Sequence, residues 1–352
     1  DTGYRECNRV TNEKKFIYES LFASNAPEPQ FGGDVKRAKY DFAVAYPDPT
    51  SIPVDGLIEA LSGALLQEGR DMAVYPHLQG YPPLREFVAQ KLARDRGIQV
   101  SAEEIILADG SSQPIHMLLE ALIDPGDVAL VENFVYSGTL RALLRFGADV
   151  RGIDCDEDGI LPDQLESAVR LALEQSKKPK LVYTIPTFQN PQGWTMTLER
   201  RIELLRISSE YGIPILEDDC YVDIRYEGES VTSIRSLDEN GQVMYVGSFS
   251  KIIAPGIRLG YLTAPVEVLN RIRAIKFGGG VNQFAALAVH RYVKSNLDSH
   301  ISKINGIQKA KRDAMVTALG ENLGPEVWWS RPDGGLYVWL EMPKDVDLVA
   351  AQ

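Results

Sequence analysis

The sequence of 352 residues is poor in cysteine and histidine and has fewer basic than acidic side chains. Its three cysteines (Cys7, Cys155 and Cys220) are far apart and odd in number, which excludes a disulfide framework and fits a reducing compartment. The four histidines lack metal-ligand spacing, so we predict no metal site. A net charge of -12 argues against nucleic acid or an anionic membrane as the main partner.

The sequence also lacks a long apolar run. No stretch approaches the roughly 18 residues of a membrane span, and the polar, charged N-terminus carries no recognisable secretion signal. We therefore expect a cytoplasmic protein. Its length suits one large and one small domain rather than a single compact unit.

From about residue 50 to residue 275, short apolar runs alternate with segments in which the apolar residues have helical periodicity. This pattern predicts an α/β fold with a mainly parallel sheet covered on both faces. The predicted strands are Ile105 to Leu107, Val128 to Val131, Leu181 to Ile185, Pro214 to Glu217, Val243 to Val246 and Leu259 to Leu262. The predicted helices between them include Pro83 to Arg94, Pro114 to Leu122, Pro162 to Gln175 and Leu198 to Tyr211.

The two ends of the chain differ from this middle part. Residues 1–50 are polar and contain prolines, and we expect a short helix and an extended arm that belong partly to a small domain. Residues 51–275 form the predicted large domain. Residues 276–352 form the predicted C-terminal small α+β domain, with a long charged helix over Asn282 to Leu323 and a strand over Gly335 to Glu341.

The segment from Gly247 to Arg258 gives the most specific indication of a catalytic site. It places Lys251 directly after Ser248 and Ser250 and seven residues ahead of Arg258, just beyond a predicted strand. Two hydroxyls and a guanidinium can bind a phosphate dianion. A partly desolvated lysine amine can form a Schiff base with a carbonyl. The carboxyl ends of strands in an open α/β sheet are where ligands usually bind.

Three further motifs follow predicted strands in the same way. Asp218 and Tyr221 stand in Leu216-Glu217-Asp218-Asp219-Cys220-Tyr221, and Asn190 begins Asn190-Pro191-Gln192-Gly193. Gly110-Ser111-Ser112-Gln113 opens a predicted helix, whose N-terminal N–H groups form a natural anion cradle.

Together these motifs resemble the class I and II aminotransferases of the aspartate aminotransferase fold, which depend on pyridoxal phosphate. The resemblance extends from about Tyr40 to Pro343 and is closest to the α-aminoadipate and kynurenine aminotransferase subgroup. It implies a seven-stranded, mainly parallel sheet sandwiched by helices. It also implies that amino groups pass from an L-amino acid to a 2-oxo acid through a Schiff base on Lys251.

The resemblance assigns a role to each motif. Asp218 would pair with the pyridine nitrogen and keep the ring an electron sink, although three consecutive acids leave the choice open by one position. Asn190 and Tyr221 would hydrogen-bond the cofactor's phenolic oxygen. Ser111 and Ser112 would join Ser248, Ser250 and Arg258 on the phosphate. Tyr136 would lie against the pyridine ring, and Tyr75 would reach the phosphate of the neighbouring subunit in a homodimer.

The sequence departs from the family in two places. The family's arginine for the substrate carboxylate lies in a C-terminal segment beyond Gln352, so the small domain is expected to be truncated or incomplete. Val44 and Ala45 stand where the subgroup commonly has glycine, beside the substrate entrance.

These departures leave other functions open. Another pyridoxal-phosphate reaction at Cα, such as elimination, decarboxylation or cyclisation in a biosynthetic pathway, is the first alternative. The ligand-sensing domain of a transcription regulator is the second, although only about 40 residues precede the fold. The amino donor and acceptor stay open as well.

Overall fold

The computed structural model describes residues 16–23, 26, 42, 44–277 and 279–347. The chain forms two compact units, residues 1–41 and 42–352. In the first, the described part holds the short 3-10 helix η1 (Glu19–Leu21), and the rest of the predicted arm lies mostly outside the described residues. The predicted boundaries near residues 50 and 275 stay predictions.

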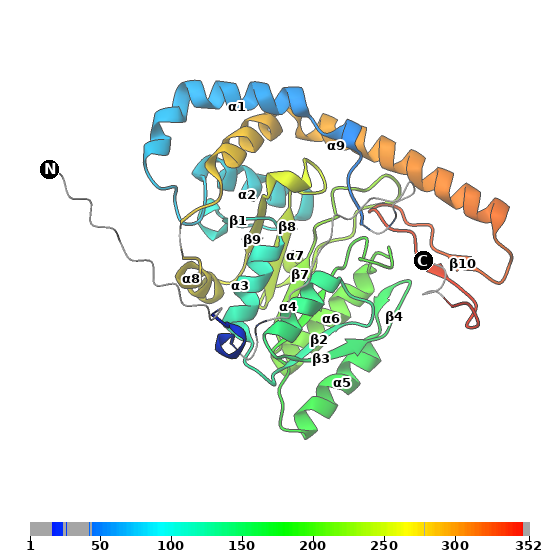
Figure 1. The fold of residues 1–352 in the computed structure, drawn as a ribbon. Coiled ribbons are helices and arrows are strands. Elements are labelled where there is room, and N and C mark those ends of the chain that lie inside the picture. Colours follow the sequence, from blue (N-terminus) through cyan, green and yellow to red (C-terminus); the bar gives the residue numbers. More distant parts are fainter. Residues whose placement is uncertain (1–15, 24–25, 27–41, 43, 278, 348–352) are drawn as a thin grey trace. The chain divides into compact units, whose positions relative to one another are not determined.

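The second unit contains the secondary structure that positions the candidate site (Figure 1). Its described strands are β1 (Ile106–Ala108), β2 (Val128–Glu132), β3 (Asp149–Ile153), β4 (Cys155–Asp156), β5 (Gly159–Ile160), β6 (Leu181–Thr184), β7 (Ile215–Asp218), β8 (Val243–Ser248), β9 (Gly260–Thr263), β10 (Trp328–Trp329) and β11 (Leu340–Glu341). Its described helices are η2 (Pro49–Ser51), α1 (Val54–Glu68), η3 (Gly69–Ala73), α2 (Pro82–Arg96), η4 (Ala102–Glu104), α3 (Ser112–Leu122), α4 (Ser137–Arg145), α5 (Pro162–Glu174), α6 (Leu198–Tyr211), α7 (Ile234–Leu237), η5 (Pro255–Ile257), α8 (Val266–Ile275) and α9 (Gln283–Asn322).

A seven-stranded sheet is the centre of this unit, in the order β1-β9-β8-β7-β6-β2-β3. The strands from β8 to β3 pair in parallel, and β9 runs antiparallel to both β1 and β8. Every residue of β2, β6, β7 and β8 is buried, as expected for parallel strands covered on both faces. The predicted mainly parallel sheet is therefore confirmed.

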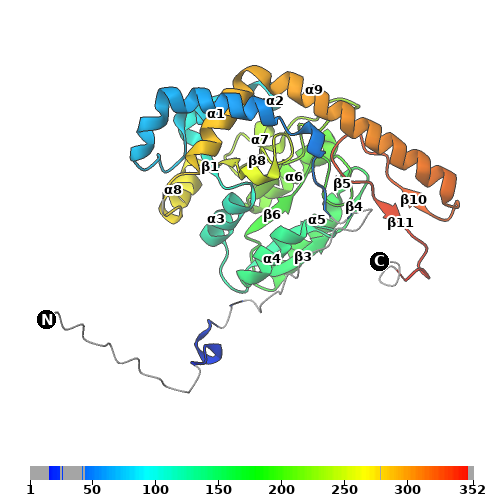
Figure 2. The same cartoon turned by 45° about the horizontal axis from the view of Figure 1, so that its top comes forward.

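Helices cover both faces of the sheet (Figure 2). Helices α3, α4 and α8 pack on one face, in a core that includes Leu118, Leu143 and Leu216. Helices α5 and α6 pack on the other face together with Ile215. The neighbours Ile215 and Leu216 thus enter opposite cores, because successive strand side chains alternate between faces. Each fully buried leucine contributes about 1.5–3 kcal/mol, and this burial fixes the register of β7.

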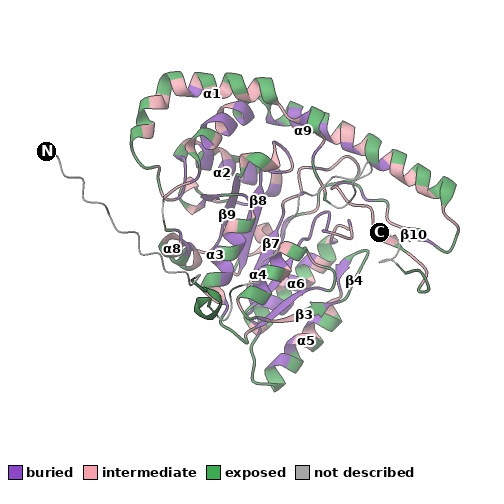
Figure 3. Cartoon of the chain, in the orientation of Figure 1, coloured by how far each residue is buried: buried purple, intermediate pink, exposed green. Residues whose placement is uncertain are grey.

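Helices α2 and α9 complete the second face beside β1, β8 and β9, and α1 packs along α9. Colouring by burial shows the strands enclosed, whereas α1 and the C-terminal half of α9 keep exposed faces (Figure 3). Among the described residues, no helix is both long and apolar enough to cross a membrane.

The structure corrects the sequence prediction at two strands. Within the predicted strand over Gly335 to Glu341, only β11 is a regular strand, and it pairs with β10. Gly335, at the start of the predicted strand, has a φ of +74°, which extended backbone does not adopt. Strand β3 was not predicted, because its alternation of charged and apolar residues is weaker than an apolar run. It lies at the edge of the sheet, where partial exposure tolerates Asp149 and Arg151.

Candidate active site

A cavity of about 170 Å³ lies at the carboxyl ends of β1, β6, β7 and β8. Ten of the eleven predicted site residues line it. The full lining is Val44, Ser111, Ser112, Tyr136, Ile185, Asn190, Asp218, Cys220, Tyr221, Ser248, Ser250, Lys251, Pro255, Arg258 and Tyr337. Segments that are distant in the sequence therefore meet at one edge of the sheet.

Lys251 extends into this cavity from the turn that follows β8. Its Nζ donates a hydrogen bond to the Ala45 carbonyl oxygen at 2.9 Å and lies 5.8 Å from the centre of the Tyr221 ring. Burial lowers the pKa of the Lys251 amine from its ordinary value. A lowered pKa increases the fraction of neutral amine, which is the form that attacks carbonyls and accepts protons.

The three consecutive acids after β7 take three different environments. Asp218 lines the cavity, whereas Glu217 accepts hydrogen bonds from Ser233 and from backbone N–H groups beyond it. Asp219 forms an ion pair with Arg96 at 2.9 Å. Of the three, the structure brings only Asp218 to the cavity.

Asp218 is a buried carboxylate that forms no ion pair with any described residue. The Tyr183 hydroxyl donates to Oδ2 at 2.8 Å and the Cys220 thiol to Oδ1 at 2.7 Å. Burial raises the pKa of Asp218 above its ordinary range. A buried carboxylate without a cationic partner fits a site for a protonated ring nitrogen, because that cation would offset the cost of burying the charge.

Asn190 and Tyr221 meet at the cavity although they follow different strands. The Asn190 Nδ2 donates to the Tyr221 hydroxyl at 3.0 Å. Burial raises the pKa of Tyr221 well above its ordinary value, so the hydroxyl keeps its proton. The pair therefore presents donor groups to the same side of the cavity.

The opposite end of the cavity has the donor set of an anion cradle. Ser112 is the first residue of α3, so N–H groups of the first helical turn lie beside its side chain. Neither the Ser112 nor the Ser250 hydroxyl bonds to another described residue. Arg258 donates to the Asp109 carbonyl oxygen at 2.8 Å, which holds its guanidinium beside the turn ahead of α3. These residues fit a phosphate group.

Gly110 leaves the space that the Arg258 guanidinium occupies. It has a φ of +73°, and a Cβ there would approach the Arg258 Cζ to 2.8 Å. We expect Gly110→Ala to cost about 1 kcal/mol of stability or more and to weaken phosphate binding by displacing the guanidinium. Thermal unfolding and titration with pyridoxal phosphate measure the two effects.

Gly126 provides the matched control for this substitution. Its φ is +90°, and no atom lies within 4 Å of the place that a Cβ would take. Gly126→Ala therefore carries the same backbone penalty without touching the cavity. Equal cofactor affinity in the two variants would contradict the role of Gly110.

Tyr75 is the one predicted site residue outside the cavity lining. It follows η3 and its side chain is 94% exposed. Within a single chain the structure therefore does not bring Tyr75 to the other site residues, and its predicted role requires a second subunit.

Tyr337 lines the cavity and was not predicted. Its ring packs edge-to-face on Tyr221, with ring centres 6.0 Å apart. The segment reaches this position because Gly334 and Gly335 press against Phe188, where a Cβ on Gly335 would meet the Phe188 Cβ at 2.6 Å. Two consecutive glycines before an aromatic residue were the available signal for this close approach.

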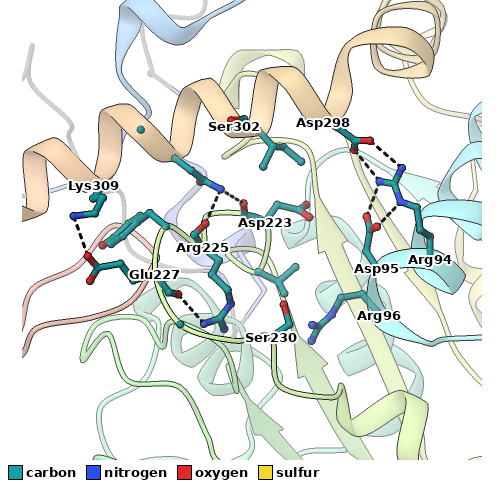
Figure 4. A pocket seen from close by; sticks show the side chains of 16 residues that line it. Arg94, Asp95, Arg96, Asp223, Arg225, Glu227, Ser230, Asp298, Ser302 and Lys309 are labelled. Carbon is teal, nitrogen blue, oxygen red and sulfur yellow. Dashed lines mark hydrogen bonds and ion pairs between the residues drawn. The ribbon is translucent and has the colours of Figure 1, made fainter.

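A larger cleft, of about 780 Å³, lies between α2, the 222–230 loop and α9 (Figure 4). It shares no lining residue with the smaller cavity. Its charges are largely paired with one another: Arg94 contacts Asp95 and Asp298, and Lys309 contacts Glu227. Mutual neutralisation leaves little excess charge to select a ligand, so the smaller cavity is the better candidate for catalysis.

The fold and the small cavity fit a class of α/β protein in which a phosphate-bearing ligand would lie between a lysine amine and a buried carboxylate. The family model for aminotransferase class I and II matches residues 44–352. The chain belongs to that family, and it is accordingly an enzyme of the pyridoxal-phosphate-dependent transferase class.

Individual relatives agree with this assignment. The chain is 36% identical over 304 residues to aromatic-amino-acid aminotransferase 1 of Thermococcus litoralis, covering 86% of this chain and 73% of the relative. It resembles the crystal structure of Pyrococcus horikoshii kynurenine aminotransferase with a TM-score of 0.84 and 33% identity, covering 88% and 77% of the two chains. It resembles a multiple substrate aminotransferase of Thermococcus profundus with a TM-score of 0.89 and 30% identity, covering 95% and 86%.

Proposed function

We propose that this protein moves the amino group of an L-amino acid to a 2-oxo acid with pyridoxal phosphate attached to Lys251. The proposal rests on one observation: Lys251, Asp218 and the anion cradle, which includes Ser112 and Arg258, all line one cavity. When bound, the cofactor condenses with amines through its aldehyde and withdraws electrons from the substrate Cα.

The residues around the cavity divide the remaining work. Lys251 provides the amine of attachment and, once released by the substrate, carries the proton away from Cα; a positioned proton-transfer group contributes about 10²–10⁴-fold. Asp218 holds the ring nitrogen as a cation. The Asn190 and Tyr221 pair donates hydrogen bonds to the phenolic oxygen, and Tyr136 supplies a flat apolar surface for the ring.

We also propose that the amino donor has a large apolar or aromatic side chain. Tyr136, Ile185, Tyr337 and Val44 form apolar parts of the cavity lining. Apart from Lys251 and Arg258, the described lining contains no cation that would select an acidic side chain. The Thermococcus litoralis and Pyrococcus horikoshii relatives are named for aromatic amino acids and kynurenine, which supports the same class.

The test is an absorption spectrum of the holoenzyme with single amino acids and no 2-oxo acid. Transamination predicts loss of the visible band with release of about one equivalent of 2-oxo acid per site, and return of the band when a 2-oxo acid is added. Release of another product, or a visible band that shifts without oxo-acid release, would replace transamination by another Cα reaction. Failure to bind the cofactor at all would contradict the whole proposal.

We further propose that the active enzyme is a homodimer in which Tyr75 completes the site of the other subunit. Tyr75 and Phe277 are 94% and 98% exposed, and the chain around Phe277 packs beside the chain around Tyr75 through the Lys276 hydrogen bond to the Leu78 carbonyl oxygen. Exposed large apolar side chains that gather on one face mark an interaction surface. We also propose that the protein works in the cytoplasm, because the cysteines of the described part of the chain, Cys155 and Cys220, are free thiols.

Mixed dimers test this arrangement. Lys251→Ala and Tyr75→Ala are each expected to be strongly impaired alone. Equal amounts, unfolded and refolded together, should recover about a quarter of wild-type activity, because half of the dimers are mixed and each mixed dimer has one intact site. Absence of recovery in samples shown to contain mixed dimers would mean that Tyr75 does not act across the interface.

A further inference from the structure

Two fully buried polar residues outside the cavity connect two of the loops that form it. Glu132 ends β2, and Gln189 immediately precedes Asn190. Both are 0% exposed. The Gln189 Nε2 donates to the Glu132 Oε2 at 2.8 Å, so the ends of β2 and β6 are joined by a contact between residues 57 positions apart.

Each member of this pair also bonds to the backbone of the loops. Glu132 Oε1 accepts from the Ile185 N–H at 2.8 Å and from the Thr184 hydroxyl at 2.6 Å. The Gln189 Nε2 donates a second hydrogen bond to the Phe134 carbonyl oxygen at 2.6 Å. Its Oε1 accepts from the Gln192 N–H at 2.7 Å. The carboxylate and the amide thus hold backbone on both sides of Asn190.

The two loops held in this way carry groups of the candidate site. The 185–193 loop presents Asn190, whose Nδ2 donates to Tyr221. The 133–136 loop ends at Tyr136, two residues after the carbonyl that Gln189 holds. Neither Glu132 nor Gln189 lines the cavity, so any effect on the chemistry passes through the lining residues that the two loops carry, Ile185, Asn190 and Tyr136.

We infer that Glu132 and Gln189 form a positioning pair that fixes Asn190 and the Tyr136 loop relative to each other. The inference rests on the proposed function only for the spectroscopic part of its test. Burying a carboxylate is costly, and burial raises the pKa of Glu132 to about 7. A carboxyl group kept buried at this cost, with its bonds directed to the end of β6 and to the 185–193 loop, is explained by the geometry it imposes.

The substitution Glu132→Gln breaks this pair selectively. The carbonyl oxygen of the introduced amide can still accept from Thr184 and Ile185, but its NH₂ group then faces the Gln189 amide, and two donors repel. Gln189→Ala removes the same contact from the other side. Gln189→Ala also removes the bonds to Phe134 and Gln192, so the double variant should show about the same effect as Gln189→Ala alone.

The measurement is the pH midpoint of the visible absorbance of the holoenzyme. Asn190 stabilises negative charge on the cofactor's phenolic oxygen in the proposed function, and its displacement should raise the midpoint by about one pH unit in both single variants. Amide hydrogen exchange, which needs no cofactor, should accelerate at least about tenfold at Gln192 in Gln189→Ala, because that variant removes the acceptor of the Gln192 N–H.

Glu217→Gln is the matched control. Glu217 is also a fully buried carboxylate near the end of a central strand; it accepts bonds from Ser233, Ile234 and Arg235, and its ion-pair partner is Arg201 at 3.9 Å. It should lower thermal stability and leave the midpoint unchanged. An unchanged midpoint in Glu132→Gln with a normal wild-type band overturns the positioning pair. A wild type without a visible band overturns the proposed function instead.

Discussion

Replacement of Lys251 by alanine is expected to abolish turnover. The variant loses both the amine that attaches the cofactor and the proton carrier at Cα, and proton transfer alone accounts for about 10²–10⁴-fold. The cradle around Ser112 and Arg258 is untouched, so pyridoxal phosphate should still bind, without the visible band of lysine-bound cofactor. Activity with a panel of amino acids and the spectrum measure both effects.

Lys276 supplies a comparison within the same chain. Its pKa is also lowered by burial, and its Nζ also donates to a backbone carbonyl oxygen, at 2.6 Å, but it does not line the cavity. Borohydride reduction of the holoenzyme should therefore attach the cofactor to the Lys251 peptide and leave the Lys276 peptide unmodified. Attachment at Lys276, or turnover by Lys251→Ala, would contradict the assignment.

Asp218→Asn is expected to lower turnover by about 10²–10³-fold, the range for losing one preorganised electrostatic partner of a reacting group. An amide cannot hold the ring nitrogen as a cation, so the ring withdraws electrons from Cα less strongly. Cofactor attachment at Lys251 should persist, which separates this variant from Lys251→Ala. Single-turnover kinetics of the visible band measure the effect.

Asp218→Asn should increase the folding stability of the apoprotein although it lowers turnover. Burial raises the pKa of Asp218 above its ordinary value of 3.8, so the folded apoprotein binds a proton that the unfolded chain has already released. Folding stability contributed by this group therefore falls as pH rises from about 3.8 through the raised pKa. Asp218→Asn removes this loss, and denaturant titration of the apoprotein should show its relative stability increasing over that window.

Cys220→Ala is the control for Asp218→Asn, because it removes only the thiol donor to Oδ1. It should change turnover by less than about tenfold, consistent with one neutral hydrogen bond. A comparable loss in both variants would mean that the packing around Asp218, rather than its charge, supports catalysis.

The sequence predicts the sheet well because burial on both faces leaves a simple pattern. Runs such as Val128 to Val131 and Val243 to Val246 are apolar without interruption, and each became a central parallel strand. The motif residues that follow those strands meet in one cavity for the same reason, since parallel strands end at a common edge. Edge strand β3, half polar and half apolar, left a weaker signal.

The parts that could not be predicted depend on contacts between distant segments. Periodicity alone does not fix which of three consecutive acids faces the cavity, because the strand register of β7 sets it; only the family resemblance favoured Asp218. Tyr337 enters the site only because Gly334 and Gly335 fit against Phe188. Glu132 and Gln189 are ordinary polar residues in the sequence, and their connection exists only once β2 and β6 lie side by side.

The reversed direction of β9 links attachment and anion binding in one short segment. Because β9 starts where β8 ends, Lys251 and Arg258 both reach the same edge of the sheet through a single turn that contains η5. Tyr337, by contrast, arrives from the far end of the chain. A shift of the 328–341 segment would therefore move Tyr337 in the cavity lining while preserving the span between the Lys251 amine and the Arg258 guanidinium. The side of the cavity that Tyr337 forms can therefore change, in evolution or by engineering, without a change in the segment that carries the amine and the guanidinium.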